Sequence, residues 1–321
     1  MKKNSKLCHE IVESALEFYA IEEDELNTFI RDTEKAGMVA DKVSVGQALK
    51  HYVRDWTEEG GNERNPGFSC VLSSILTLLP HGLSYEEKPR IAIPGAGLGR
   101  LGHEVAQLGL CLPNIYYRDK IARGLQLSGF DVTMNEWSMY MNAAYRFLES
   151  HHRRHSVSFY PFVDSWSHHA TTGDMLRQVL FPDVAIDVSS VLLIEGDFTT
   201  ILRDHGGTYD IVLTYFFIDT ARNLMSYLNA IYMLLKPGGH WINFGPLLYG
   251  SAPFVQLSLE EIIVISETLG FKFLESQPIC GDLTFPGKQI RGKEAIYGFN
   301  ERALTKNAYN AQFWIAQKVG L

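Results

Sequence analysis

Apolar runs in the middle of the chain alternate with amphipathic segments, and each run stops at a glycine or a polar residue. The runs begin near Ile91, Phe130, Val191 and Tyr209, and a fifth follows at His240. The run at Tyr209 is apolar enough for a central strand that is buried on both faces. Strands that alternate with helices in this way predict an α/β fold with a mainly parallel sheet.

The first run ends in three alternating glycines, Gly95, Gly97 and Gly99, and Arg100 then opens a helix-like segment. Glycine lets the backbone turn sharply and approach a ligand, and free amides at the start of a helix favour an anionic group. This pattern suits a nucleotide or cofactor loop. The spacing is not the G-x-G-x-x-G of dinucleotide folds, and a tight strand-to-helix turn is the alternative.

Acidic residues follow the later runs at the points where parallel strands would present their carboxyl ends. Glu136 ends the second run, where a carboxylate can accept hydrogen bonds from both hydroxyls of a ribose. Asp197 and Phe198 end the third run and suit an adenine amino group and ring face, although Asp197 could instead cap a helix. Asp219 ends the fourth run. We therefore expect these carboxylates on one edge of the sheet.

Helical patterns occupy the chain before the first predicted strand. Residues 5–37 predict one polar amphipathic helix whose apolar stripe is interrupted at Glu22. Residues 43–58 and 68–79 predict two more helices, separated by a loop over 60–67. We expect residues 1–88 to form a helical cap and residues 89–321 to form the main domain.

Composition and charge narrow the class of protein. The chain has 321 residues, 46% of them hydrophobic, which favours one α/β domain with an N-terminal helical extension. Its formal charge of -8 disfavours nucleic acid as a partner and suits a small or basic substrate. The absence of a basic-then-apolar leader and of a long apolar run predicts no secretion and no membrane association.

The cysteines are scattered without C-x-x-C spacing. This pattern predicts neither a metal site nor a disulfide framework, and it favours a cytoplasmic or nuclear location. The four cysteines are Cys8, Cys70, Cys111 and Cys280.

A Lys-Pro-Gly-Gly turn at 236–239 and a series of ordered motifs carry a family resemblance. The chain resembles the class I S-adenosylmethionine-dependent methyltransferases, and within them the carnosine N-methyltransferase family, over roughly residues 45 to 318. The resemblance implies a Rossmann-like fold with a seven-stranded, mostly parallel sheet and helices on both faces. It also implies S-adenosylmethionine as cofactor, and methyl transfer to the imidazole of carnosine, giving anserine. The motifs are residues 53–56, 94–100, 135–138, 181–183, 196–198, 216–221 and 241–249.

The same resemblance assigns roles residue by residue. Arg54 corresponds to an arginine that contacts the cofactor. A guanidinium can donate two parallel hydrogen bonds to the cofactor's carboxylate. His51 stands where the family has glutamine, and a solvated position on the helix face is its alternative. The implied cofactor residues are His51, Arg54, Gly95, Gly97, Gly99, Arg100, Glu136, Asp197, Phe198 and Tyr215, and the implied substrate residues are Asp219, Tyr297, Tyr309 and Gly250.

Asp219 is the candidate catalytic residue. An imidazole that attacks a methyl group must carry its lone pair on one nitrogen, and a carboxylate that accepts from the other ring nitrogen fixes that tautomer and stabilises the cation formed. Tyr297 and Tyr309 would line the pocket, although core packing is the commoner fate of such tyrosines.

Two departures from the family leave the acceptor open. Gly250 replaces a histidine that contacts carnosine, and residues 110–128 lengthen a connection that usually has about 2–6 residues. We interpret 110–128 as a surface insertion or an unspliced intron. Another small-molecule or protein nitrogen is the alternative acceptor, and an inactive cofactor-binding scaffold is the non-enzymatic alternative. The resemblance also allows a homodimer, for which the N-terminal helices could supply a contact.

Overall fold

The computed structural model describes residues 2–38, 42–79, 88–108, 129–250 and 253–320, so the predicted insertion at 110–128 lies outside the described residues. The chain forms two compact units that alternate along the sequence. The first unit comprises Met1–Arg64, Ser138–Val188 and Gly298–Lys306, and the second comprises Asn65–Trp137, Ser189–Tyr297 and Asn307–Leu321. These units are defined by contacts within the folded chain, and they do not show which parts fold alone. The domain boundary expected at residue 88 therefore stays a prediction.

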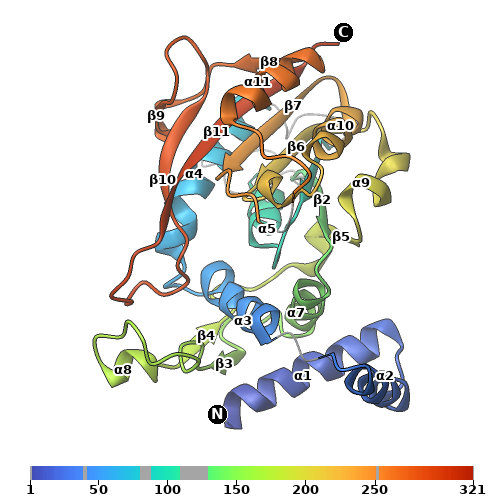
Figure 1. The fold of residues 1–321 in the computed structure, drawn as a ribbon, viewed down its shortest axis with the longest axis vertical. Helices are drawn as coiled ribbons and strands as arrows, with labels where there is room; N and C mark the ends of the chain where they lie inside the picture. Colours follow the sequence, from blue (N-terminus) through green and yellow to red (C-terminus); the bar gives the residue numbers. More distant parts are fainter. Residues whose placement is uncertain (1, 39–41, 80–87, 109–128, 251–252, 321) are drawn as a thin grey trace, which may run out of the picture. The chain divides into compact units, whose positions relative to one another are not determined.

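Five parallel strands form one half of the sheet in the second unit, in the order β5-β2-β1-β6-β7 (Figure 1). The order reverses at β1, since β2 and β6 flank it on opposite sides, and ligands of open α/β sheets bind beyond the strand ends at such a point. All five predicted strands are present, but the fifth begins at Leu235 and so includes residues 236–239, which were expected to form a turn before the strand. They are β1 (Arg90–Pro94), β2 (Asp131–Glu136), β5 (Val191–Glu195), β6 (Tyr209–Tyr215) and β7 (Leu235–Gly245).

The other half of the sheet is antiparallel and is built on β11 (Ala308–Lys318), which pairs with β7. β8 (Phe271–Leu274) and β10 (Arg291–Ile296) pair with successive stretches of β11, and β9 (Asp282–Leu283) pairs with β10. The described residues thus give this sheet nine strands, where seven were expected. The two additional strands are the β9 and β10 hairpin, and the arrangement confirms the expected α/β fold with a mainly parallel sheet.

Helices cover the sheet through apolar faces that repeat every three or four residues. In α10 (Leu224–Leu234), the buried positions Leu224, Leu228 and Ile231 pack in one cluster with Trp241 of β7. Ser258 lies three residues before Glu261, a spacing that predicts a helix cap, and α11 (Leu259–Thr268) begins there with a capping box in which the two residues exchange hydrogen bonds. The other helices here are α5 (Arg100–Gln107), α9 (Phe198–Ile201), and the 3-10 helices η1 (Val188–Ser190), η2 (Arg203–His205), η3 (Ile218–Thr220) and η4 (Pro278–Cys280).

The first unit contains the N-terminal helices, and the single helix expected over 5–37 is two helices. The chain breaks after Tyr19 because Ala20 has a left-handed backbone (φ 52°) and Glu22 is extended. The Tyr52 hydroxyl donates to the carbonyl of Ala144 at 2.6 Å, which fixes α3 against α7. The elements are α1 (Lys2–Tyr19), α2 (Glu23–Lys35), α3 (Lys42–Trp56), α7 (Met139–Ser150), β3 (Val157–Phe159), α8 (Thr172–Met175) and β4 (Val179–Phe181).

The loop expected over 60–67 is wrong, because α4 (Gly61–Leu78) begins at Gly61 and includes Pro66. The buried Arg64 explains the short connection. Its guanidinium donates to the carbonyls of Arg54 (2.9 Å) and Thr57 (2.7 Å) at the end of α3, and to the Asp183 carboxylate (2.8 Å). Carbonyls that the end of a helix leaves without partners are thus satisfied by the next helix.

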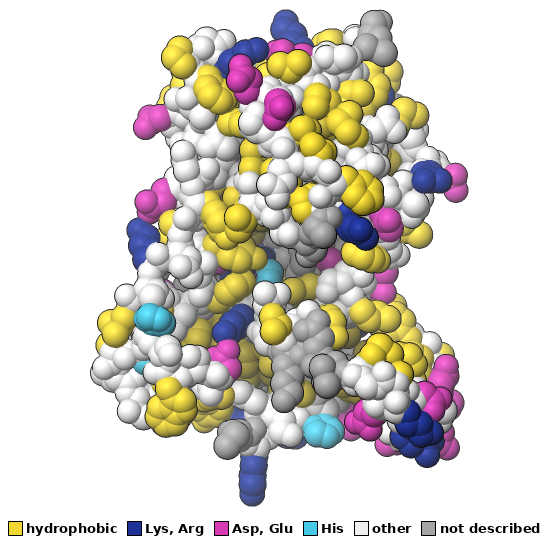
Figure 2. Space-filling view, viewed as in Figure 1, with side chains coloured by type: hydrophobic (Ala, Val, Ile, Leu, Met, Phe, Trp, Pro, Cys, Tyr) yellow, Lys and Arg dark blue, Asp and Glu magenta, His cyan; other side chains and the backbone are white. Residues whose placement is uncertain are grey.

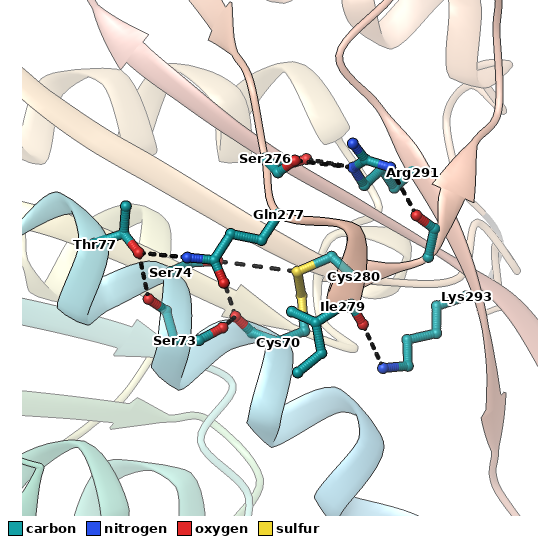
Figure 3. Close-up of a disulfide and its surroundings, with 11 residues drawn as sticks. Cys70, Ser73, Ser74, Thr77, Ser276, Gln277, Ile279, Cys280, Arg291 and Lys293 are labelled. Carbon is teal, nitrogen blue, oxygen red and sulfur yellow. Dashed lines mark hydrogen bonds between the residues drawn. A yellow bond between two sulfur atoms is a disulfide. The ribbon is translucent and has the colours of Figure 1, made fainter.

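A disulfide joins Cys70 of α4 to Cys280 of η4, and both residues are fully buried (Figure 3). The Gln277 amide also donates to the Thr77 hydroxyl at 2.7 Å, close to the disulfide. The expectation of no disulfide is therefore wrong for this pair. Its partners are 210 residues apart, so local spacing carries no signal of it. The cytoplasmic or nuclear location stays a prediction.

Charged side chains are spread over the surface. On the face shown in Figure 2, Lys and Arg side chains are scattered among Asp and Glu. None of the described helices carries an apolar stretch that would span a bilayer.

Candidate active site

The glycine loop lies at the carboxyl end of β1, and all three glycines have left-handed backbones. The φ angles of Gly95, Gly97 and Gly99 are 66°, 56° and 77°. A Cβ at Gly95 would overlap the ring of Phe217, so a side chain is excluded there by contact as well as by conformation. The loop delivers the chain into α5, where Gly99 is the N-cap.

Glu136 at the end of β2 lies against this loop. Its Oε2 accepts from the amide of Gly97 at 2.8 Å, and its Oε1 accepts from the amide of Trp137 at 2.8 Å. Each oxygen of a carboxylate can accept a second hydrogen bond. The structure thus brings together the glycine loop and the predicted ribose acceptor.

The corner after β5 joins the same edge of the sheet. Asn135 donates to the carbonyls of Ile194 and Gly196, both at 2.9 Å, and the Gly196 amide donates to the carbonyl of Glu136 at 2.9 Å. These bonds fix the end of β5 beside the end of β2. Asp197 follows directly after this corner.

Asp197 caps α9, which was the alternative for this residue, because its Oδ1 accepts from the Thr199 amide at 2.8 Å. Phe198 is only 3% exposed, and its ring packs edge-on to Phe217 and Tyr227. That ring belongs to the core of the second unit. The predicted contacts of both residues with adenine stay predictions.

Tyr227 was missed by sequence reasoning and lies at this edge. Its ring stacks on Phe217 with 4.7 Å between ring centroids. Burial raises the pKa of Tyr227, a hydrogen bond with Thr220 opposes this, and the negative charges of Asp197 and Glu136 raise the pKa further. In the sequence it reads as one more apolar position of a helix.

Asp219 lies in η3, just beyond the carboxyl end of β6. It is 7% exposed, and its Oδ2 accepts from the amide of Leu248 at 3.0 Å. Burial raises the pKa of Asp219 to about 6. A carboxyl with a raised pKa at the carboxyl end of a central strand is a candidate for proton or hydrogen-bond chemistry.

Aromatic rings meet around Phe216, three residues before Asp219. Tyr297 stacks on Phe216 at a centroid distance of 5.2 Å, and Tyr309 lies edge-on at 6.1 Å. Tyr215 lies 5.2 Å away on the strand side. The structure thus gathers Tyr215, Tyr297 and Tyr309, which the sequence predicted, around Phe216, which it did not.

Phe216 has a left-handed backbone with φ 51°, held by its amide donating to the Phe244 carbonyl at 2.8 Å. Such a conformation costs a residue with a side chain on the order of 1 kcal/mol, and it is concentrated at functional sites. Nothing in the sequence signals it.

Gly250 lies on the surface after β7. A Cβ built at this position meets no atom within 4 Å. A larger side chain therefore fits there without displacing the described neighbours.

The first unit holds His51 and Arg54 on α3. Nη2 of Arg54 donates to Nδ1 of His51 at 2.8 Å, and its Nε donates to Oδ1 of Asp55 at 2.7 Å. The His51 side chain is only 12% exposed, so the solvated alternative is wrong. Burial and the neighbouring Arg54 lower the pKa of His51, against the opposing effect of Asp55, and so favour the neutral ring. Burial would raise the pKa of Asp55, but Arg54 and the His51 hydrogen bond hold it well below its usual range.

Arg100 at the start of α5 is buried and pairs with Glu104 at 2.8 Å. Within the described ranges, no group of three or more His, Cys, Asp or Glu side chains is arranged to hold a metal ion.

Proteins of one known family match this chain over most of its length. The model of the family described as "Carnosine N-methyltransferase" matches residues 32–115 and 120–319. The mouse (Mus musculus) carnosine N-methyltransferase is 33% identical over 281 residues, which cover 84% of this chain and 62% of the mouse protein. The Schizosaccharomyces pombe protein of the same name is 26% identical over 99% of this chain and 80% of its own length. The chain thus spans less than two thirds of the mouse relative.

Among solved structures, the CurJ carbon methyltransferase is 13% identical and aligns with a TM-score of 0.41 over 78% of this chain and 52% of its own. S-adenosylmethionine is the cofactor, and the left-handed glycine loop with the Glu136 carboxylate fits its adenosyl part. The match over most of its length shows that the chain belongs to the carnosine N-methyltransferase family.

Proposed function

We propose that the chain transfers the methyl group of S-adenosylmethionine to an imidazole nitrogen of carnosine, giving anserine, or of a similar histidine-containing peptide. The observation that carries this proposal is the buried carboxyl of Asp219, which follows Phe216 by three positions along the chain, together with the stacking of Tyr297 and Tyr309 around Phe216. Family membership supports methyl transfer, and this arrangement suits a flat, N–H-bearing ring.

When bound, the cofactor supplies an activated methyl group on a sulfonium, so the protein's task is mainly to position the acceptor. Asp219 would accept a hydrogen bond from one imidazole N–H and so leave the lone pair on the other nitrogen. The same carboxylate stabilises the imidazolium that forms on methylation. The Leu248 amide fixes the orientation of Asp219.

Aromatic rings would hold the imidazole flat. Tyr297 and Tyr309 are both partly exposed, so their faces are not fully covered by the core. Stacking on such rings contributes about 0.5–1.5 kcal/mol per pair beyond the buried area.

The cofactor would be held by groups that the chain has already oriented. Glu136 suits the ribose hydroxyls, the glycine loop suits the close approach of the amino-acid part, and Asp197 suits the adenine amino group. Arg54 suits the carboxylate, since a guanidinium binds carboxylates through parallel N–H bonds.

A second candidate keeps the reaction and changes the acceptor. It is favoured by Gly250, which leaves open space where the family places a histidine that contacts carnosine. Another imidazole or amine metabolite, or a histidine side chain of a protein, then becomes the substrate.

The test is transfer of labelled methyl from S-adenosylmethionine to carnosine, free histidine and cell-extract proteins. We expect carnosine to be labelled, and Asp219→Asn to lower kcat/KM by at least 100-fold. Asp204→Asn, at an exposed position of η2, is the matched control and should act like the wild type. Labelling of another acceptor alone would reject carnosine. If calorimetry detects no binding of S-adenosylmethionine, the scaffold alternative is favoured.

A further inference from the structure

Residues Gly298–Lys306 connect β10 to β11, yet they pack within the unit that contains Arg54. The Leu304 amide donates to the His168 carbonyl at 2.8 Å, and Oδ1 of Asn300 accepts from Arg177 at 2.8 Å. The Asn62 amide donates to Glu301 at 2.7 Å on the exposed side. This loop is therefore fixed at several points along its length.

Glu63 fixes the start of the same loop from the first turn of α4. A single oxygen, Oε2, accepts from the amides of Gly298 at 3.1 Å and Phe299 at 2.8 Å. Its other oxygen, Oε1, is buried and has no hydrogen-bond partner among the described residues. Burial raises the pKa of Glu63, against the opposing effects of Arg54 and the two amides. Because both amides are accepted by a single oxygen, the amide oxygen of a glutamine could accept the same two hydrogen bonds.

Phe299 has a left-handed backbone, with φ 57°, which is unfavourable for a residue with a side chain. The hydrogen bond from its amide to Glu63 helps to hold this conformation. Its ring centroid lies 5.0 Å from that of His51 and 5.6 Å from Cζ of Arg54. The ring of Phe299 therefore borders the pair of side chains that the family resemblance assigns to the cofactor.

We propose that Glu63 is a positioning residue for Arg54, which it serves by holding Gly298 and Phe299 so that the Phe299 ring confines the guanidinium. The inference rests on the proposed role of Arg54 toward the cofactor carboxylate. An arginine side chain has many rotamers, and a guanidinium that is already oriented loses less conformational freedom on binding. Asp55 and His51 accept hydrogen bonds from two nitrogens of the Arg54 guanidinium, Nε and Nη2. The aromatic ring of Phe299 adds a contact with the same guanidinium.

The test compares two ligands by calorimetry. S-adenosylhomocysteine carries the carboxylate, whereas 5′-methylthioadenosine lacks the whole amino-acid part. We expect Glu63→Ala to weaken S-adenosylhomocysteine about tenfold and to leave 5′-methylthioadenosine within about twofold. Glu63→Gln should restore binding, because its amide oxygen accepts the same two N–H groups. Phe299→Leu should reproduce the selective loss with Glu63 intact.

The matched control is Glu301→Ala, which removes a carboxylate that accepts from Asn62 rather than from the Gly298 and Phe299 amides, and it should bind both ligands like the wild type. Equal losses for both ligands in Glu63→Ala, no loss, or failure of Glu63→Gln to restore binding would each overturn the proposal. Arg54→Ala should also lose the carboxylate ligand selectively, and if it does not, the role of Arg54 fails with it. A wild-type chain that binds neither ligand would instead reject the proposed function.

Discussion

Asp219 carries the clearest link between one residue and a measurable pH dependence. Its pKa of about 6 means that the carboxylate needed to accept an imidazole N–H is lost as the pH falls through 6. We expect kcat/KM for carnosine to decline below that pH. The acceptor imidazole titrates near 6.5 as well, so Asp219→Asn should retain only the decline that belongs to the substrate. An unchanged pH profile in the variant would contradict the role.

The same shift predicts how Asp219 affects stability. Because folding raises its pKa, its contribution is fully present below the unfolded value near 3.9 and is lost as the pH rises through 6. Asp219→Asn should therefore raise the free energy of unfolding at pH 8 by up to about 3 kcal/mol, and with it the Tm. At pH 4 the substitution should change the Tm little. Thermal unfolding at both values checks this. A Tm that rises equally at both would show that the charge is not the cause.

Gly250 sets a prediction about the acceptor. No described atom outside its chain neighbours lies within 4 Å of a Cβ built at this position, so a histidine, which the family places there, is the natural substitution. We expect Gly250→His to raise kcat/KM for carnosine by about tenfold if one hydrogen bond of about 1.4 kcal/mol is gained. Gly250→Ala adds the Cβ without an imidazole and is the control. Equal effects of both variants would exclude an imidazole contact.

Single residues were predicted where their chemistry is local. Ser258 reads as a cap because a glutamate follows three residues later, and the structure has that capping box. Phe216 and Tyr227 could not be recognised, since an aromatic residue in an apolar run looks like core packing whatever its ring contacts. Glu63 lies in the segment that was expected to be a loop, and its partners lie more than 230 residues away.

Helices and strands were predicted well where the apolar residues form a continuous run along the chain. The parallel strands are near-continuous apolar runs, so β1, β2, β5 and β6 appear where expected, and β7 contains its predicted run but begins earlier, at Leu235. The prediction failed around 60–67, where Gly and Pro signalled a loop. There the carbonyls at the end of α3 are satisfied by Arg64 of α4, a long-range solution that local turn signals do not contain.

The disulfide between α4 and η4 predicts a stability difference at the level of elements. A closed loop of this length is expected to contribute about 2–5 kcal/mol by restricting the unfolded chain. Adding a reductant should therefore lower the urea midpoint of the wild type. The Cys70→Ala/Cys280→Ala double variant should unfold at a lower midpoint and be insensitive to reductant. A wild-type midpoint that is unaffected by reductant would mean that the bridge adds nothing.

At the scale of the whole molecule, the sequence does not reveal which distant segments pack together, even where it predicts their secondary structure. The first unit is assembled from three separate segments, and α1 and α3 both pack on α7, which comes from the second of them. Periodicity along the chain contains no information about such long-range contacts. A homodimer through the N-terminal helices stays a prediction.

The interleaved chain predicts that residues 1–88 do not fold alone. Such a fragment lacks Ala144, which accepts from Tyr52, and Asp183, which pairs with the buried Arg64. Loss of one partner of a buried ion pair costs about 3–5 kcal/mol. We expect the isolated fragment to show little cooperative unfolding by circular dichroism, with the full chain as control. A cooperative transition in the fragment would support the boundary at residue 88.

The bridge between Cys70 and Cys280 encloses most of the chain in one covalent ring. A protease that cuts once inside this ring produces two peptides that stay attached on a gel without reductant and separate when reductant is added. Because only the oxidised form behaves in this way, nicked protein isolated under thiol-blocking conditions records whether the compartment of its origin allowed the sulfurs to join.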